Sequence, residues 1–136
     1  MMTKKAILYS SGLGKTRKIA AYAAKELKAD IFDLKKQTVI DLSEYSHIIF
    51  GTGIHAGKPY GALVRFIKDN KDQLTSKKKS LFLSCMLKDE KGEAQLKAVS
   101  NELRISDAYF FHGKGEKNDE GMEIAVDDFI KEMRTR

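Results

Sequence analysis

The sequence has little of the chemistry on which several protein classes depend. It contains one cysteine, Cys85, one proline and no tryptophan among 136 residues. A single cysteine cannot form an internal disulfide, and together with three scattered histidines it offers no spacing typical of a zinc site. We therefore expect a chain without disulfides or bound metal, in the reducing environment of the cytoplasm.

Long hydrophobic runs are also missing. No apolar stretch approaches the roughly 20 residues that a membrane-spanning helix needs. The basic start of the chain is followed by a short apolar run, Ala6–Tyr9, which is too short for the core of a signal peptide. With 42% hydrophobic residues over 136 positions, we expect one globular domain, residues 1–136, that builds its own core.

The charge of the chain is biased toward the positive. Lys and Arg number 25 against 19 Asp and Glu, which gives a net charge of +6 and an isoelectric point near 9.3. Such a charge favours acidic partners, peripheral contact with an anionic surface such as a membrane, or an anionic substrate, although scattered lysines can serve solubility alone. The one dense basic run, Lys77–Lys79, has no interleaved aromatic residues, so we expect no nucleic-acid binding.

A stretch rich in hydroxyl side chains and glycine follows the first apolar run. Ser10–Thr16 lies between Tyr9 and a helix-like segment that begins at Arg17. The free N–H groups of such a loop and of the first helical turn attract an anion, and the hydroxyls add donors. The stretch fits neither G-x-x-x-x-G-K-[ST], which requires glycine in place of Tyr9, nor G-x-G-x-x-G, which requires glycine in place of Arg17. It predicts a site for a single terminal phosphate, and the alternative interpretation is an ordinary turn that caps the helix.

The rest of the chain alternates between expected strands and helices. Apolar runs predict strands at 5–10, 30–34, 47–50 (ending at Gly51), 80–85 and 107–112, and helical periodicity predicts helices at 17–27, from Pro59 to Leu74, around Val99 and at 122–133. Lys88–Gly92 is expected to be a charged loop. Five strands alternating with four helices favour a three-layer α/β fold with a parallel sheet and right-handed crossovers.

Two motifs carry a resemblance to a known family. Ser10-Ser11-Gly12-Leu13-Gly14-Lys15-Thr16, directly after Ile7-Leu8-Tyr9, resembles the phosphate-binding signature of the flavodoxins, and Asp41–Ile54 resembles their third strand and flavin-facing loop. The continuation, His55–Tyr60 and Leu63–Asn70, looks most like the branch that contains flavodoxin-type protoporphyrinogen oxidases. The resemblance implies a three-layer flavodoxin-like sandwich with a five-stranded parallel sheet in the order 2-1-3-4-5, and FMN as the cofactor.

The same resemblance implies three groups of contacts with FMN. The phosphate is expected on Ser10, Ser11, Gly12, Leu13, Gly14, Lys15 and Thr16. The isoalloxazine ring is expected against Thr52, Gly53, Ile54, His55, Ala56 and Gly57, with Tyr60 as a further candidate, and its pyrimidine side against Ser84, Cys85, Met86 and Leu87. A peptide at Gly53 or Gly57 is expected to reorient toward the reduced flavin, whereas His47 and His112 are expected to be structural.

The function implied by the resemblance is electron transfer through bound FMN, with a redox partner protein or a quinone as the other reactant. A quinone-coupled porphyrinogen oxidase is the first alternative, and a flavin-free interaction module is the second. The chain departs from the family because it has no tryptophan to stack on the ring. It also has only a short polar stretch, Gly113–Gly121, where the protoporphyrinogen oxidases carry a longer segment linked to membrane association. These departures place the electron carrier ahead of porphyrinogen oxidation.

Overall fold

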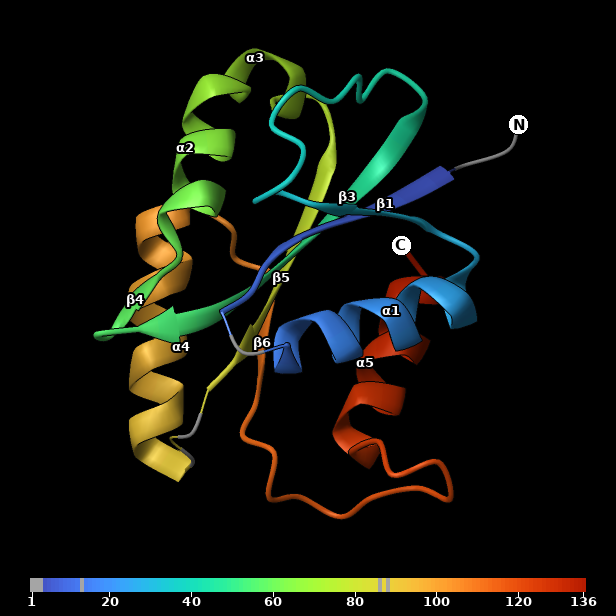
Figure 1. The fold of residues 1–136 in the computed structure, drawn as a ribbon, viewed down its shortest axis with the longest axis vertical. Coiled ribbons are helices and arrows are strands. Elements are labelled where there is room, and N and C mark those ends of the chain that lie inside the picture. Colours follow the sequence, from blue (N-terminus) through green and yellow to red (C-terminus); the bar gives the residue numbers. More distant parts are fainter. Residues whose placement is uncertain (1–3, 13, 86, 88) are drawn as a thin grey trace.

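A parallel sheet runs through the centre of the molecule, and helices cover both of its faces (Figure 1). The computed structural model describes residues 4–12, 14–85, 87 and 89–136. Leu13 and Met86, two of the residues expected at the site, lie outside this part of the chain. The elements are β1 (Lys4–Ser10), α1 (Lys15–Leu27), β2 (Asp30–Asp33), β3 (Tyr45–His55), β4 (Lys58–Pro59), α2 (Gly61–Asp69), α3 (Lys71–Leu74), β5 (Lys78–Ser84), α4 (Asp89–Leu103), β6 (Ala108–Phe111) and α5 (Ile124–Arg134).

The strand order agrees with the expected topology. Five strands pair in parallel in the order β2-β1-β3-β5-β6, and the short β4 pairs antiparallel with the end of β3. Counted over the parallel strands alone, this is the order 2-1-3-4-5, so the flavodoxin-like sandwich is confirmed. The carboxyl ends of the parallel strands meet at one edge of the sheet, and the site lies there.

Two hydrophobic layers hold the helices against the sheet. One layer joins Leu8, Phe50 and Leu81 of the sheet to α2 and α4 through Leu63, Phe66, Val99 and Leu103. The other joins Ile7, Ile49 and Phe82 to α1 and α5 through Ile19, Ala20, Ala23, Val126, Phe129 and Met133. The central strands read as continuous apolar runs because helices cover them on both faces. Among the described helices, none is long and apolar enough to cross a membrane.

β3 is longer than the sequence predicts. It continues past the expected end at Gly51 to His55, and a tight turn at Ala56 and Gly57 then leads into β4. These two residues have φ values of 51° and 78°, and a type I′ hairpin turn requires positive φ at both positions. Gly51 lies inside the strand, and glycine is needed there because a Cβ would overlap the Phe82 ring of β5. This glycine serves packing and does not end the strand.

The expected start of the second helix is also wrong. Pro59 lies in β4 opposite Ile54, and α2 begins at Gly61. A short edge strand tolerates proline because the missing N–H group is not needed in the ladder.

The expected charged loop before the third helix is instead helical from Asp89 onward. Asp89 and Glu90 stand in the first turn of α4, where negative side chains interact favourably with the helix dipole. Gly92 lies within this helix and allows α4 to approach the sheet closely, because a Cβ there would lie 2.5 Å from Phe110 Cε2.

Candidate functional site

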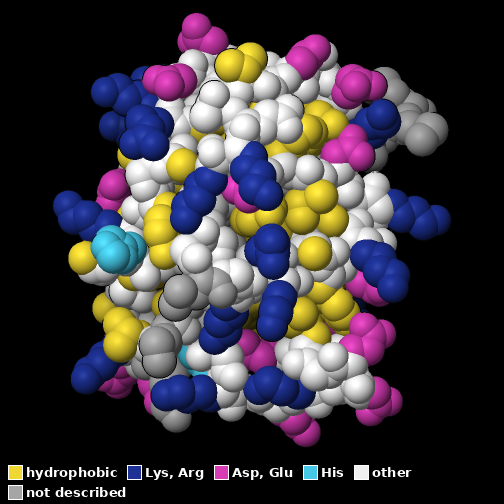
Figure 2. Space-filling model, viewed as in Figure 1, with side chains coloured by type: hydrophobic (Ala, Val, Ile, Leu, Met, Phe, Trp, Pro, Cys, Tyr) yellow, Lys and Arg dark blue, Asp and Glu magenta, His cyan; other side chains and the backbone are white. Residues whose placement is uncertain are grey.

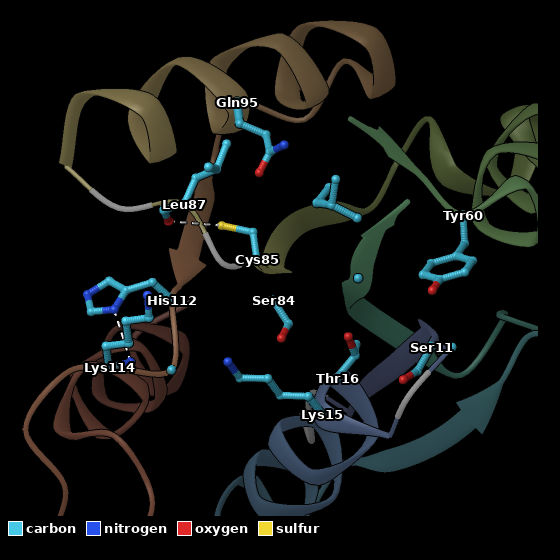
Figure 3. Close-up of a pocket in the computed structure, with 14 residues that line it drawn as sticks. Ser11, Lys15, Thr16, Tyr60, Ser84, Cys85, Leu87, Gln95, His112 and Lys114 are labelled. Atoms are coloured by element: carbon cyan, nitrogen blue, oxygen red, sulfur yellow. Dashed lines mark hydrogen bonds between the residues drawn. The ribbon is translucent and has the colours of Figure 1, made fainter. Parts of the chain in front are cut away.

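A cavity of about 530 Å³ lies at the carboxyl edge of the sheet, where β1, β3, β5 and β6 end (Figure 3). Its volume is within the range of about 300–1,000 Å³ that is usual for small-molecule sites. The lining residues are Ser11, Gly12, Lys15, Thr16, Gly53, Ile54, Tyr60, Ser84, Cys85, Leu87, Gln95, His112, Gly113 and Lys114.

The loop between β1 and α1 forms the first wall. Ser11 Oγ accepts a hydrogen bond of 3.0 Å from the Gly14 N–H group, and Gly14 takes a φ of 86° immediately before the helix. The N-cap position of α1 makes no side-chain hydrogen bond, and its first turn carries no acidic residue. The donors and the positive end of the helix dipole are therefore available to an anion.

Two buried hydroxyl groups flank this loop, Ser10 before it and Thr16 after it. Ser10 is 0% exposed, and its Oγ has no hydrogen-bond partner among the described residues. Thr16 is 2% exposed and lies beside Gly53, where an added Cβ would come within 3.3 Å of Thr16 Oγ1. A buried polar group without a partner costs about 1–3 kcal/mol. A ligand that supplied an acceptor to Ser10 would remove that cost.

Tyr60 lies across this loop from the β3 side of the cavity. A Cβ at Gly12 would overlap the Tyr60 hydroxyl, and a Cβ at Gly53 would lie 3.0 Å from Tyr60 Cε2. The Tyr60 N–H group donates to the buried Thr52 Oγ1 over 3.1 Å, and Lys35 Nζ lies 4.9 Å from the ring centroid. The two glycines thus make room for one aromatic ring, which the buried threonine and the lysine help to position.

The segment after β5 forms the second wall. The Cys85 N–H group donates to the Phe111 carbonyl over 3.1 Å, and Cys85 Sγ contacts the Leu87 carbonyl at 3.4 Å. Burial raises the pKa of the Cys85 thiol, so it stays protonated at neutral pH and is a weak nucleophile. Gln95 of α4 also lines the cavity, and its Oε1 is buried without a partner in the described part of the chain. This amide can offer both an acceptor and donors to a ligand.

The loop between β6 and α5 forms the third wall, and a buried carboxylate fixes it. Glu123 is 5% exposed, and its two oxygens accept hydrogen bonds from the N–H groups of Gly113 (2.8 Å) and Gly115 (3.3 Å). Lys117 Nζ donates to the Gly113 carbonyl over 3.1 Å. His112 Nδ1 accepts the Lys114 N–H group at 3.1 Å.

The structure brings most of the expected site residues together. Around the cavity are Ser11, Gly12, Lys15, Thr16, Gly53, Ile54, Ser84, Cys85 and Leu87. Ser10, Gly14 and Thr52 are adjacent to this lining but are not part of it, and His55, Ala56 and Gly57 belong to the hairpin of β3 and β4, also outside the lining.

Four lining residues are missing from the expected set. Gly113 and Lys114 follow a strand that ends at this edge of the sheet, and their position after that strand could have indicated that they line the cavity. His112 was expected to be structural, yet it lines the cavity. Gln95 stands in the middle of a helix and has no local signal, because its place in the cavity depends on how α4 packs on the sheet.

The family of the chain follows from comparison with known proteins. A family model described as a flavodoxin domain matches residues 6–119. The chain belongs to the flavodoxin domain family. This result confirms the resemblance carried by the two sequence motifs, and it supports a redox flavoprotein with FMN as its cofactor.

Individual proteins share between 20% and 39% of their aligned residues with this chain. An uncharacterized protein of Methanocaldococcus jannaschii is 39% identical over 80 residues, which cover 58% of this chain and 52% of the relative. Protoporphyrinogen IX dehydrogenase (quinone) of Escherichia coli K12 is 30% identical over 106 residues, which cover 74% of this chain and 58% of the enzyme. The chain thus spans little more than half the length of these curated relatives. Oxidised flavodoxin 1 from Bacillus cereus has the same fold, with a TM-score of 0.65, 20% identity, and coverage of 95% of this chain and 93% of that protein.

Proposed function

We propose that this chain binds FMN in the cavity at the carboxyl edge of the sheet and passes electrons through the bound flavin. The observation that carries the proposal is the buried, unpartnered Ser10 hydroxyl behind a loop that leads into the uncapped start of α1. Together with Ser11 and Thr16, these groups offer N–H and O–H donors, which suit the terminal phosphate of FMN. Bound FMN supplies the electron chemistry, while the protein positions it and tunes its potential.

The remaining walls suit the flavin ring. Ile54 and Tyr60 offer an apolar and an aromatic surface on the β3 side, and Cys85 and Leu87 line the β5 side. Gln95 adds an amide that can pair with the polar edge of the ring system. Of the two glycines expected to reorient on reduction, Gly53 is the better candidate because it lines the cavity, whereas Gly57 lies in the hairpin turn.

Replacing Thr16 by alanine tests the phosphate assignment. FMN affinity should fall about tenfold or more, because one hydrogen bond to a charged group is lost, while riboflavin, which has no phosphate, should bind almost as before. Thr38→Ala serves as a control, since Thr38 is exposed and outside the cavity lining. Equal losses for FMN and riboflavin would contradict the assignment.

A stability measurement separates this proposal from a flavin-free interaction module. FMN at 100 times its dissociation constant should raise the free energy of unfolding by about 2.7 kcal/mol. A purified protein that is colourless and gains no stability from added FMN would support the flavin-free module instead.

The net positive charge of the chain is the basis on which we propose its electron-transfer partner. Basic side chains are spread over the middle of the face in Figure 2, while acidic ones lie mainly toward its rim. With a net charge of +6, the chain suits a redox protein with an acidic docking surface, and a quinone is the other candidate. Affinity for an acidic partner should fall with added salt, whereas quinone reduction should be nearly insensitive to it.

The similarity to protoporphyrinogen IX dehydrogenase favours a second candidate function, the oxidation of a porphyrinogen coupled to a quinone. Turnover of protoporphyrinogen with a quinone by the FMN-loaded protein tests it. Multiple turnovers would establish an enzyme, whereas a single stoichiometric reduction of the flavin would indicate a carrier. The cytoplasmic location stays a prediction.

A further inference from the structure

Lys15 brings a positive charge to the cavity, and its side chain extends toward Gly113 instead of toward the loop that precedes it. It is the first residue of α1, directly after the loop proposed to bind the phosphate, yet the end of its side chain lies beside Gly113 of the third wall. An added Cβ at Gly113 would overlap Lys15 Nζ and lie 2.8 Å from its Cε. In Figure 3 the ammonium group points toward the side where Ser84 and His112 lie. The side chain is therefore directed away from its own loop and toward Gly113, and the residue stays exposed to solvent.

The charged groups around Lys15 leave its ammonium group free to interact with a ligand. None of the ion pairs found among the described residues involves Lys15. Glu123 is the acidic side chain of the third wall; its oxygens accept backbone N–H groups of the loop, and it forms no ion pair with Lys15. Cys85 is held in its neutral form by burial, and Lys114 adds a second cation at the rim. This half of the cavity therefore favours an anion.

We infer that Lys15 stabilises the negative charge that the flavin ring gains on reduction, and so raises the reduction potential. The inference rests on the proposed function. Full reduction of bound FMN would take two electrons from an external reductant and one proton from water, and would leave one negative charge on the ring. Lys15 points toward the side of Ser84, where the pyrimidine part of the ring is expected, so its ammonium group would lie near that charge and tune the flavin. A lysine that bound only the phosphate would favour both oxidation states equally.

The experiment compares Lys15→Met with Lys18→Met. Lys18 lies on the same helix, is exposed and does not line the cavity, so both variants lower the net charge by one and the control removes the long-range effect. Dissociation constants are measured for oxidised FMN and, anaerobically with dithionite, for reduced FMN. Lys15→Met should lose about tenfold more affinity for reduced than for oxidised FMN, which corresponds to a two-electron potential about 30 mV lower. Lys18→Met should leave the ratio unchanged, and Lys15→Arg should restore it.

The outcomes separate this inference from the proposal beneath it. If native protein binds FMN and Lys15→Met weakens both oxidation states equally, the inference is overturned and Lys15 is a phosphate contact; riboflavin affinity would then be unaffected by the substitution. If native protein binds neither form of FMN, the proposed function itself fails.

Discussion

Replacing Gly12 by alanine probes how closely the loop between β1 and α1 fits against Tyr60. The added Cβ would overlap the Tyr60 hydroxyl and lie 3.0 Å from Cζ. Ordinary contacts between such atoms are about 3.5 Å, so the hydroxyl end of the ring would have to move by more than about 1 Å. That movement meets resistance, because the Tyr60 N–H group is bonded to Thr52 Oγ1 at 3.1 Å and Lys35 Nζ lies 4.9 Å from the ring centroid.

The size of the effect follows from the geometry of the overlap. Overpacking by one methyl group costs about 1–3 kcal/mol, and the lower part of this range applies because the contact is made by the far end of a side chain. We expect the displaced ring to lower FMN affinity about tenfold, or about 1.4 kcal/mol.

A double-mutant cycle measures the coupling directly. FMN titrations, followed by quenching of flavin fluorescence, would compare the native protein with Gly12→Ala, Tyr60→Phe and the combined variant. Tyr60→Phe removes the overlapping oxygen, so the combined variant should bind FMN better than the sum of the single effects by about 1 kcal/mol. Coupling within about 0.3–0.5 kcal/mol, the scatter for independent sites, would refute the reasoning. Thermal unfolding of each apoprotein checks that the fold is kept.

Three further substitutions test other walls and the core. Glu123→Gln should lower the free energy of unfolding in urea by about 1–3 kcal/mol and weaken FMN binding, because one oxygen that accepts a loop N–H group becomes a donor; unchanged values would refute this. Gln95→Leu should raise apoprotein stability by about 1 kcal/mol and lower FMN affinity, since it removes a buried unpartnered atom that a ligand would satisfy, and a fall in stability would contradict it. Burial lowers the pKa of His47 to about 4. The unfolded chain therefore binds a proton at this residue near pH 6.5, whereas the folded chain binds it only near pH 4. Stability should therefore fall by up to about 3 kcal/mol as the pH drops from 6.5 to 4, and His47→Gln should lose this part of the slope in unfolding titrations.

Much of the fold could be predicted from local patterns. β1 and α1 follow from a continuous apolar run and from a stripe of Ile19, Ala20 and Ala23, and all three stripe residues are buried as expected. These patterns are local because a strand covered on both faces must be apolar whatever helix covers it. The strand order came from the family resemblance and not from periodicity.

Glycine was the least informative residue of the sequence. The sequence predicts that Gly51 ends a strand and that Gly92 belongs to a loop, but Gly51 lies inside β3 and Gly92 inside α4. At each position the missing Cβ makes room for an aromatic ring of a neighbouring strand, Phe82 or Phe110. Either use of glycine produces the same local sequence. The choice depends on a residue distant in the chain, so sequence patterning alone could not make it.

Unsatisfied buried atoms separate the ligand site from the rest of the interior. In the described part of the chain, three buried side-chain atoms lack a partner: Ser10 Oγ, Gln95 Oε1 and His47 Nδ1. Folded proteins pair about 90% or more of such groups, so each exception requires a cause. Gln95 lines the cavity, and Ser10 directly precedes Ser11, which lines it too, so one ligand could reach both elements. His47 instead bonds Ser80 through Nε2 at 2.8 Å, and its lowered pKa keeps the ring neutral, so Nδ1 carries a lone pair without a buried charge. The first two exceptions call for a ligand, whereas the third is explained by the neutral form of the side chain.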